Sequence, residues 1–107
     1  MSGPPDPSVE QMLAEARLQF AASLPAKAAA LQEHLARGAW EEAKRAAHKL
    51  RGSAGTYGFA VLGAAAGEVE EALIAAGLKP DADAAARIGD KASEARAEAE
   101  RIAKEGA

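Results

Sequence analysis

Apolar residues recur along most of the chain at spacings of three and four, which is the period of an amphipathic α-helix. No stretch alternates apolar and polar residues with a period of two, so the pattern predicts no strands. The protein is therefore expected to be all-α. Five apolar stripes carry the pattern: Val9, Leu13, Ala16 and Phe20; Leu24, Ala28, Leu31 and Leu35; Trp40, Ala43, Ala47, Leu50, Ala54 and Tyr57; Leu62, Ala66, Val69, Leu73 and Ala76; and Ile88, Ala92, Ala95, Ala99 and Ile102.

Polar residues, glycine and proline predict where these helices begin and end. Ser8 starts the first helix, with Gln11 at the spacing of a capping box. The run 23–25, Ser-Leu-Pro, predicts a break or restart, because proline is tolerated only in the first turn of a helix. The remaining boundaries are expected at Gly38, Gly58, Gly77 with Pro80, and at Asp83 as a cap for the last helix.

The connections between the predicted helices are short, which favours antiparallel neighbours. The expected fold is an up-and-down antiparallel four-helix bundle with an additional N-terminal helix or helix segment. A chain of 107 residues forms one domain. Residues 1–7, with Pro, Gly and Asp, are expected to be a flexible tail, and residues 8–105 the bundle.

Composition narrows the classes of function. The chain has no cysteine, so disulfides and thiolate metal sites are excluded. The net charge of −3 argues against a general nucleic-acid binder. No apolar run is long enough to span a membrane, and the first residues do not resemble a signal peptide. We expect a cytoplasmic protein with no membrane contact, and a monomer.

His48 is the first candidate for chemistry. It follows Ala47, a position on the apolar seam, and one residue along a helix is a rotation of about 100°, so His48 should leave the core. A neutral imidazole is a nucleophile near pH 7, and nearby cations would balance a phosphoryl group on it. Glycines beside it would let a partner approach closely. Its neighbours on the same face supply both the cations and the glycines: Lys44, Arg45, Arg51, Gly52 and Gly55. Lys49, the next residue, is a further supporting candidate.

Glu70 is expected to lie beside His48. If the third and fourth predicted helices form a hairpin that turns near Phe59, residues equally far from the turn lie side by side. His48 is eleven residues before Phe59, and Glu70 is eleven residues after it. A carboxylate there could accept a hydrogen bond from one imidazole nitrogen and leave the other free to attack.

The chain resembles histidine phosphotransfer (HPt) domains in the run from His48 to Phe59, which reads HKLRGSAGTYGF. The resemblance extends over roughly residues 20–75. It implies a bundle built on four antiparallel helices with His48 as the phosphorylated residue, through Nε2. It also places Arg51 at the position of the cation that stabilises the phosphate and Gly52 where the partner closes in.

The resemblance further implies the partners: a histidine kinase and the receiver domain of a response regulator, which supplies an aspartate, Mg²⁺ and a catalytic lysine. The chain shows no nucleotide site of its own, so it is expected to carry the phosphate rather than act as an independent enzyme, and to need no cofactor. The run 55–59 is similar to the N-terminal domain of chemotaxis histidine kinases, in which a glutamate at the position of Glu70 orients the histidine. Gly67 departs from that subgroup, which usually carries a second histidine there, and Arg51 replaces the commoner lysine.

Plainer interpretations stay open beside these. The bundle could be a non-catalytic adaptor with a degenerate site. Lys44, Arg45 and Lys49 could form a solvated helix face, and Glu70 could be an ordinary surface carboxylate. His34 is expected to be a surface histidine, and no metal site is expected. The partner surface near His48 should include an apolar patch, drawn from Leu50, Tyr57 or Leu62.

Overall fold

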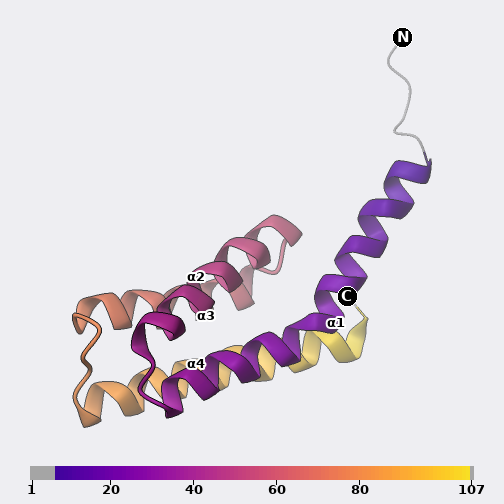
Figure 1. Cartoon of the computed structure of the whole chain (residues 1–107). Coiled ribbons are helices and arrows are strands. Elements are labelled where there is room, and N and C mark those ends of the chain that lie inside the picture. The colour runs from indigo at the N-terminus through magenta and orange to yellow at the C-terminus, as the bar shows by residue number, and fades with distance from the viewer. Residues whose placement is uncertain (1–6, 107) are drawn as a thin grey trace.

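Four helices account for almost all of residues 7–106, the part of the chain that the computed structural model describes (Figure 1). They are α1 (Pro7–Ala36), α2 (Trp40–Tyr57), α3 (Ala60–Ala75) and α4 (Ala82–Glu105). The described residues contain no strand, and the all-α prediction is confirmed. Residues 1–6 of the predicted tail lie outside the described residues. Pro7, which was assigned to that tail, is instead the first residue of α1, where the missing N–H of proline costs no helical hydrogen bond.

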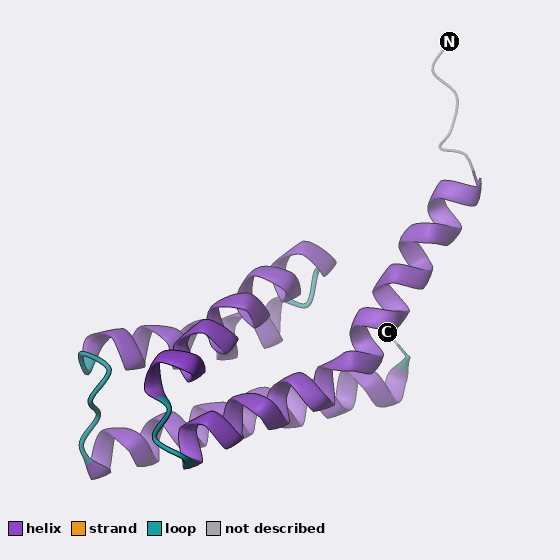
Figure 2. Ribbon diagram, viewed as in Figure 1, coloured by secondary structure: helices purple, strands orange, loops and turns teal. Residues whose placement is uncertain are grey.

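The helices pack as two antiparallel pairs, as predicted for an up-and-down bundle. Within the described residues, α1 packs along α4 and α2 along α3, while α3 also contacts α4 and α1 also contacts α2. In that part of the chain, the backbones of the two diagonal pairs, α1 with α3 and α2 with α4, do not come as close to each other. Figures 1 and 2 show the α2–α3 pair lying over the α1–α4 pair.

The core is built from the predicted stripes and divides into two clusters along the bundle. One lies at the end where α2 turns into α3 and includes Phe20, Leu62 and Ile102. The other lies towards the opposite end and includes Leu31 and Leu73. Alanines fill many of the remaining core positions of α2, α3 and α4. Their small side chains let the helices approach closely.

The predicted break at residues 23–25 is wrong, because α1 continues through it. Pro25 stands inside the helix and cannot donate to the carbonyl of Ala21, and the Ser23 hydroxyl donates to the carbonyl of Phe20 at 2.6 Å. Both arrangements weaken or distort the helical ladder locally and bend helices. Figure 1 shows the result, a change of direction in α1 between its N-terminal part and the part beside α4.

The N-terminal part of α1 projects beyond the bundle (Figure 1), and we call its exposed residues up to residue 15 the arm. The residues of the first predicted stripe that precede Phe20 therefore do not form part of the core. Val9 is 47% exposed and Leu13 65% exposed, and only Phe20 at the base of the arm is buried. The stripe has helical spacing, but no helix of the bundle extends far enough to cover it.

The turn between α2 and α3 fixes the register of the hairpin. Gly58 adopts φ +80°, as predicted for a glycine that ends a helix, and the next amide, that of Phe59, donates to the carbonyl of Ala54 at 2.8 Å. Arg17 of α1 donates from Nη1 to the carbonyl of Tyr57 at 2.6 Å and lies over the ring of Phe59. The C-terminal end of α2 is thus held both by the turn into α3 and by a side chain of α1.

The start of α4 differs from the prediction by two residues. Asp81, not Asp83, is the N-cap, and its carboxylate accepts from the amide of Ala84 at 2.8 Å. Asp83 lies in the first turn of α4, where its negative charge is favourable near the positive end of the helix dipole. Gly38 and Gly77 both have positive φ and follow the ends of α1 and α3, as predicted.

Candidate functional site

His48 lies near the middle of α2 and points away from the core. Ala47, one residue earlier, is fully buried against the other helices, and the side chain of His48 is 73% exposed. The rotation of about 100° between successive helical residues accounts for this difference. The imidazole is therefore open to a partner, although it stands on a helix that is rigidly packed on its other face.

Glu70 of α3 holds one side of the imidazole. His48 Nδ1 lies 2.6 Å from Glu70 Oε2, so the hairpin brings the two residues level, as the equal distances from Phe59 indicate. Glu70 is only 9% exposed. A carboxylate oxygen accepts, so Nδ1 carries the proton and donates it in this bond. The lone pair of the neutral ring is then on Nε2, which has no hydrogen-bond partner among residues 7–106.

Arg51 holds the other oxygen of the same carboxylate. Its Nη1 lies 3.2 Å from Glu70 Oε1 and 3.5 Å from Glu71 Oε1. A buried carboxylate is costly unless its charge and its acceptor positions have partners. Arg51 and His48 together provide them, and Glu70 becomes the centre of a three-residue group that joins α2 to α3.

The exposed imidazole borders an open hollow of about 570 Å³, which is lined by His48, Arg51, Gly52, Gly55, Glu70, Glu71 and Ile74. Gly52 and Gly55 lie on α2 within four and seven residues of His48. Apart from the adjoining backbone of α2 itself, a Cβ atom built on either glycine would meet no atom of residues 7–106 within 4 Å. No packing contact in the described part of the chain requires glycine at these two positions, and the absence of side chains leaves the surface beside the histidine open.

This arrangement suits a nucleophile that receives a group from a partner protein. It combines an exposed imidazole nitrogen, a carboxylate that orients the ring, an adjacent guanidinium and an open approach. Comparison with protein families gives a match to the model of the Hpt domain over residues 15–104. The chain belongs to the Hpt domain family. Comparisons with curated proteins and with solved structures give no match.

The family match covers most of α1 and all of α2 and α3, and it ends at residue 104 in the last turn of α4. Hpt domains act in histidine phosphotransfer within phosphorelays, and they interact with receiver domains and kinases. The resemblance of the chain to this family is thereby confirmed. The match begins inside the arm of α1, so the first eight residues of that helix lie outside it.

The predicted cations divide between different surfaces of the Hpt domain. Arg51 lines the hollow of His48, whereas Lys44 and Arg45 both pair with Glu41 on α2, at 3.3 and 3.6 Å. Lys49 lines a separate groove between α1 and α2. The structure therefore brings one of the predicted cations into direct contact with the His48–Glu70 pair.

The apolar patch beside His48 is not the one that the sequence suggested. Leu50 and Leu62 are buried, and Tyr57 is half-buried against the core, so these side chains offer little surface. Ile74, 57% exposed, lies in the hollow instead. Sequence reasoning missed both Ile74 and Glu71, although the hairpin register indicates them. Glu71 follows Glu70 directly, and Ile74 lies one helical turn beyond Glu70.

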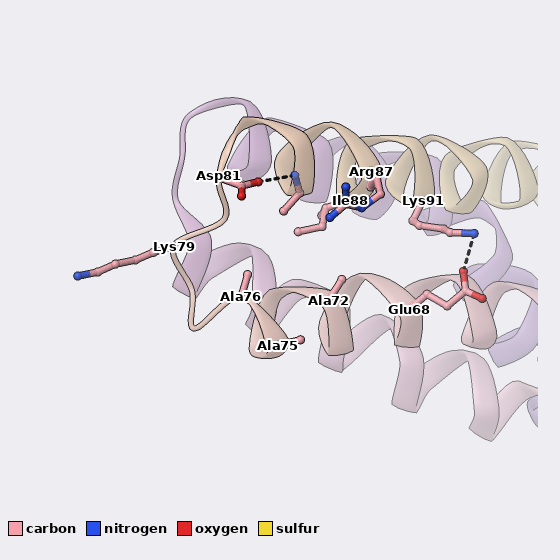
Figure 3. Close-up of a pocket in the computed structure, with 10 residues that line it drawn as sticks. Glu68, Ala72, Ala75, Ala76, Lys79, Asp81, Arg87, Ile88 and Lys91 are labelled. Atoms are coloured by element: carbon pink, nitrogen blue, oxygen red, sulfur yellow. Dashed lines mark hydrogen bonds and ion pairs between the residues drawn. The ribbon is translucent and has the colours of Figure 1, made fainter.

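A second hollow of the Hpt domain, of about 560 Å³, lies between α3 and α4 (Figure 3). Its floor is largely alanine with Ile88, and Glu68 and Lys91 pair across one end at 3.2 Å. Asp81 at the other end caps α4, as Figure 3 shows. None of its lining residues is a histidine, and none of them lines the hollow of His48.

The structure also bears on metals and membranes. Between residues 7 and 106, no three His, Cys, Asp or Glu side chains gather closely enough to hold a metal ion. In the same part of the chain, no helix is both long enough and apolar enough to cross a lipid bilayer.

Proposed function

We propose that His48 accepts a phosphoryl group and exchanges it with the aspartate of a response-regulator receiver domain, and that a histidine kinase can also phosphorylate it. The observation that carries this proposal is the state of the imidazole. Its Nδ1 is held by the buried carboxylate of Glu70 at 2.6 Å, while the ring is 73% exposed. A fixed tautomer with its lone pair outward is what an attack on phosphorus needs.

In the proposed step, the lone pair of His48 Nε2 forms a bond to the phosphorus of an aspartyl phosphate. The bond between phosphorus and the aspartate oxygen breaks, and its electron pair leaves with the carboxylate. No proton has to move, because Nδ1 keeps its own. The ring becomes positively charged as the bond forms, and Glu70 lies where it stabilises that charge. The reverse step returns the phosphoryl group to the aspartate.

Arg51 and the two glycines support this reaction in different ways. The guanidinium of Arg51 lies beside the imidazole, and it supplies positive charge and several donors for the oxygens of a phosphoryl group. Gly52 and Gly55 leave open space beside the ring, so a receiver domain can bring its aspartate into line. Lys44 and Lys49 contribute to the positive charge of α2 without lining the hollow of His48.

The receiver domain supplies the rest of the machinery in this proposal. Phosphoryl transfer requires in-line positioning and neutralisation of charge. The receiver would bind the Mg²⁺ ion and supply a catalytic lysine, and this domain would supply the acceptor nitrogen. We propose that the domain works in this way as a monomer in the cytoplasm, where a kinase finds ATP.

The test is transfer from a panel of pre-phosphorylated receiver domains, read by intact mass, with His48→Gln as the matched variant. We expect the wild type to gain one acid-labile phosphate and the variant to gain none. A phosphate that survives acid, or that persists in the variant, would overturn the assignment of His48. Absence of transfer from a broad panel and from kinases would favour a non-catalytic adaptor instead.

A further inference from the structure

Gly67 lies on α3 at the point where the side chain of Arg51 crosses from α2. A Cβ atom built on Gly67 would lie 3.1 Å from Arg51 Nε, 3.2 Å from Cζ and 3.3 Å from Cδ. These distances are shorter than ordinary van der Waals contact, so the arginine occupies the space that a side chain at residue 67 would need. Gly67 itself is buried under it.

Nothing in the backbone explains this glycine. Gly67 is inside a regular helix and does not have a positive φ. Glycine in a helix interior is unfavourable relative to alanine. Glycine at this position instead provides space for the side chain of Arg51, because the atoms that a Cβ would meet belong to that side chain and not to the backbone of another helix.

The surface of α3 at Gly67, on which Arg51 lies, adjoins the two carboxylates that bind the arginine. Gly67, Glu70 and Glu71 are three and four residues apart, so they lie on one side of α3. Cδ of Arg51 and the Nε–Cζ part of its guanidinium lie over Gly67, and its Nη1 reaches Glu70 at 3.2 Å and Glu71 at 3.5 Å. Arg51 is thereby fixed along its length, although its side chain is half-exposed.

We propose that Gly67 is a positioning residue for phosphotransfer, an inference that rests on the function proposed for His48. The missing side chain lets Arg51 lie against α3 and bind one oxygen of Glu70, while His48 binds the other. A carboxylate held at both oxygens keeps its plane, and the plane of the carboxylate sets the orientation of the imidazole. Gly67 therefore acts on the reacting nitrogen through Arg51 and Glu70, without touching it.

The test compares Gly67→Ala with Gly63→Ala. Gly63 is one turn earlier on the same helix, and a Cβ there would meet its nearest neighbours, Ala54 and the carbonyl of Arg51, at 3.7 Å, which is ordinary contact. Gly67→Ala displaces a long, flexible side chain, so the bundle should still fold. Arg51→Gln removes the same contact without any change in α3 and covers the case in which Gly67→Ala fails to fold.

Two readouts are measured for each variant. The first is the ¹⁵N spectrum of the His48 imidazole, which reports how firmly Nδ1–H is fixed. The second is the single-turnover rate of transfer from a phosphorylated receiver. We expect Gly67→Ala to shift the ring resonances towards a mixture of tautomers and to slow transfer roughly three- to tenfold. We expect Gly63→Ala to match the wild type in both.

The double variant Gly67→Ala/Arg51→Gln shows whether the effect passes through the arginine. We expect it to match Arg51→Gln alone, because Gly67 then has nothing left to position. The inference is overturned if Gly67→Ala behaves like Gly63→Ala, or if it slows the Arg51→Gln protein by a further equal factor. If the wild type accepts no phosphate at all, the proposed function fails, and the imidazole spectra alone still decide whether Gly67 positions the ring.

Discussion

Replacing the two glycines beside His48 by alanine is predicted to raise the stability of the domain and to slow phosphotransfer. Gly52 and Gly55 are helical, and an added Cβ at either would meet no other part of the described chain within 4 Å. Alanine is more favourable than glycine in a helix interior by about 1 kcal/mol. The variant Gly52→Ala/Gly55→Ala should therefore gain about 2 kcal/mol, which raises Tm by roughly 8–15 °C in a domain of this size. Thermal unfolding by circular dichroism measures the gain.

The same two methyl groups should impair transfer, because they protrude where a receiver must approach. Overpacking in a close contact costs about 1–3 kcal/mol, which corresponds to a loss of about 5- to 150-fold in rate or affinity. Transfer from a phosphorylated receiver would be followed in single-turnover experiments. Phosphorylation by the small donor phosphoramidate should be almost unchanged, because this donor does not need the flat surface.

Gly89→Ala is the matched control. Gly89 is a helical glycine of α4, and a Cβ there also meets no atom within 4 Å, but it lines a groove between α1 and α4 away from His48. This variant should gain about 1 kcal/mol and transfer phosphate like the wild type. The reasoning is refuted if the double variant at positions 52 and 55 loses stability. It is equally refuted if that variant gains stability and transfers at the wild-type rate.

Three further outcomes are expected. Glu70→Gln should keep the bundle folded yet slow transfer roughly tenfold or more in single-turnover assays, because the charge that orients the imidazole is lost; an unchanged rate would contradict that role. Leu13→Ala on the arm should change the free energy of unfolding by less than about 0.5 kcal/mol. Leu24→Ala in the core of the same helix should lower it by about 2–5 kcal/mol. Urea unfolding measures both values, and equal losses would place Leu13 in the core. A hydrogen bond from Arg101 lowers the pKa of Glu98 below its ordinary value of 4.5. The pair therefore contributes its full stabilisation at pH values above 4.5. This contribution is lost as the pH falls through the lower pKa that Glu98 has in the folded state. The stability gap between wild type and Arg101→Gln should therefore close in acid, and a gap of constant size from pH 7 to pH 2 would contradict the assignment.

Local rules predicted the hairpin well because few parameters determine it. A seam of alanine and leucine fixed which side of α2 is buried, and a short turn at Gly58 fixed the level of Glu70 relative to His48. The same rules failed at Pro25, where tertiary packing of α1 on α4 outweighs the loss of one helical hydrogen bond. They failed again at Leu13, because helical spacing alone does not say whether a partner helix extends that far.

Pairing within the site was harder to predict than the site itself. The sequence places Lys44 and Arg51 on the same side of α2 as His48, but it does not say which acid each one binds. Lys44 has Glu41 within a turn on its own helix, whereas Arg51 finds Glu70 across the hairpin. The space at Gly67 that admits Arg51 depends on how close α3 lies to α2, and the sequence of one chain does not give that distance.

All the groups around the acceptor nitrogen belong to one helical hairpin. His48, Arg51 and the two open glycines come from α2, and Gly67, Glu70, Glu71 and Ile74 come from α3. The α1–α4 pair lines no part of this hollow and serves as its backing. The domain thus separates two kinds of constraint. Its first and last helices supply the apolar face behind the hairpin and, through Arg17, a hydrogen bond to the end of α2, while the groups around the acceptor nitrogen all come from residues 48–74.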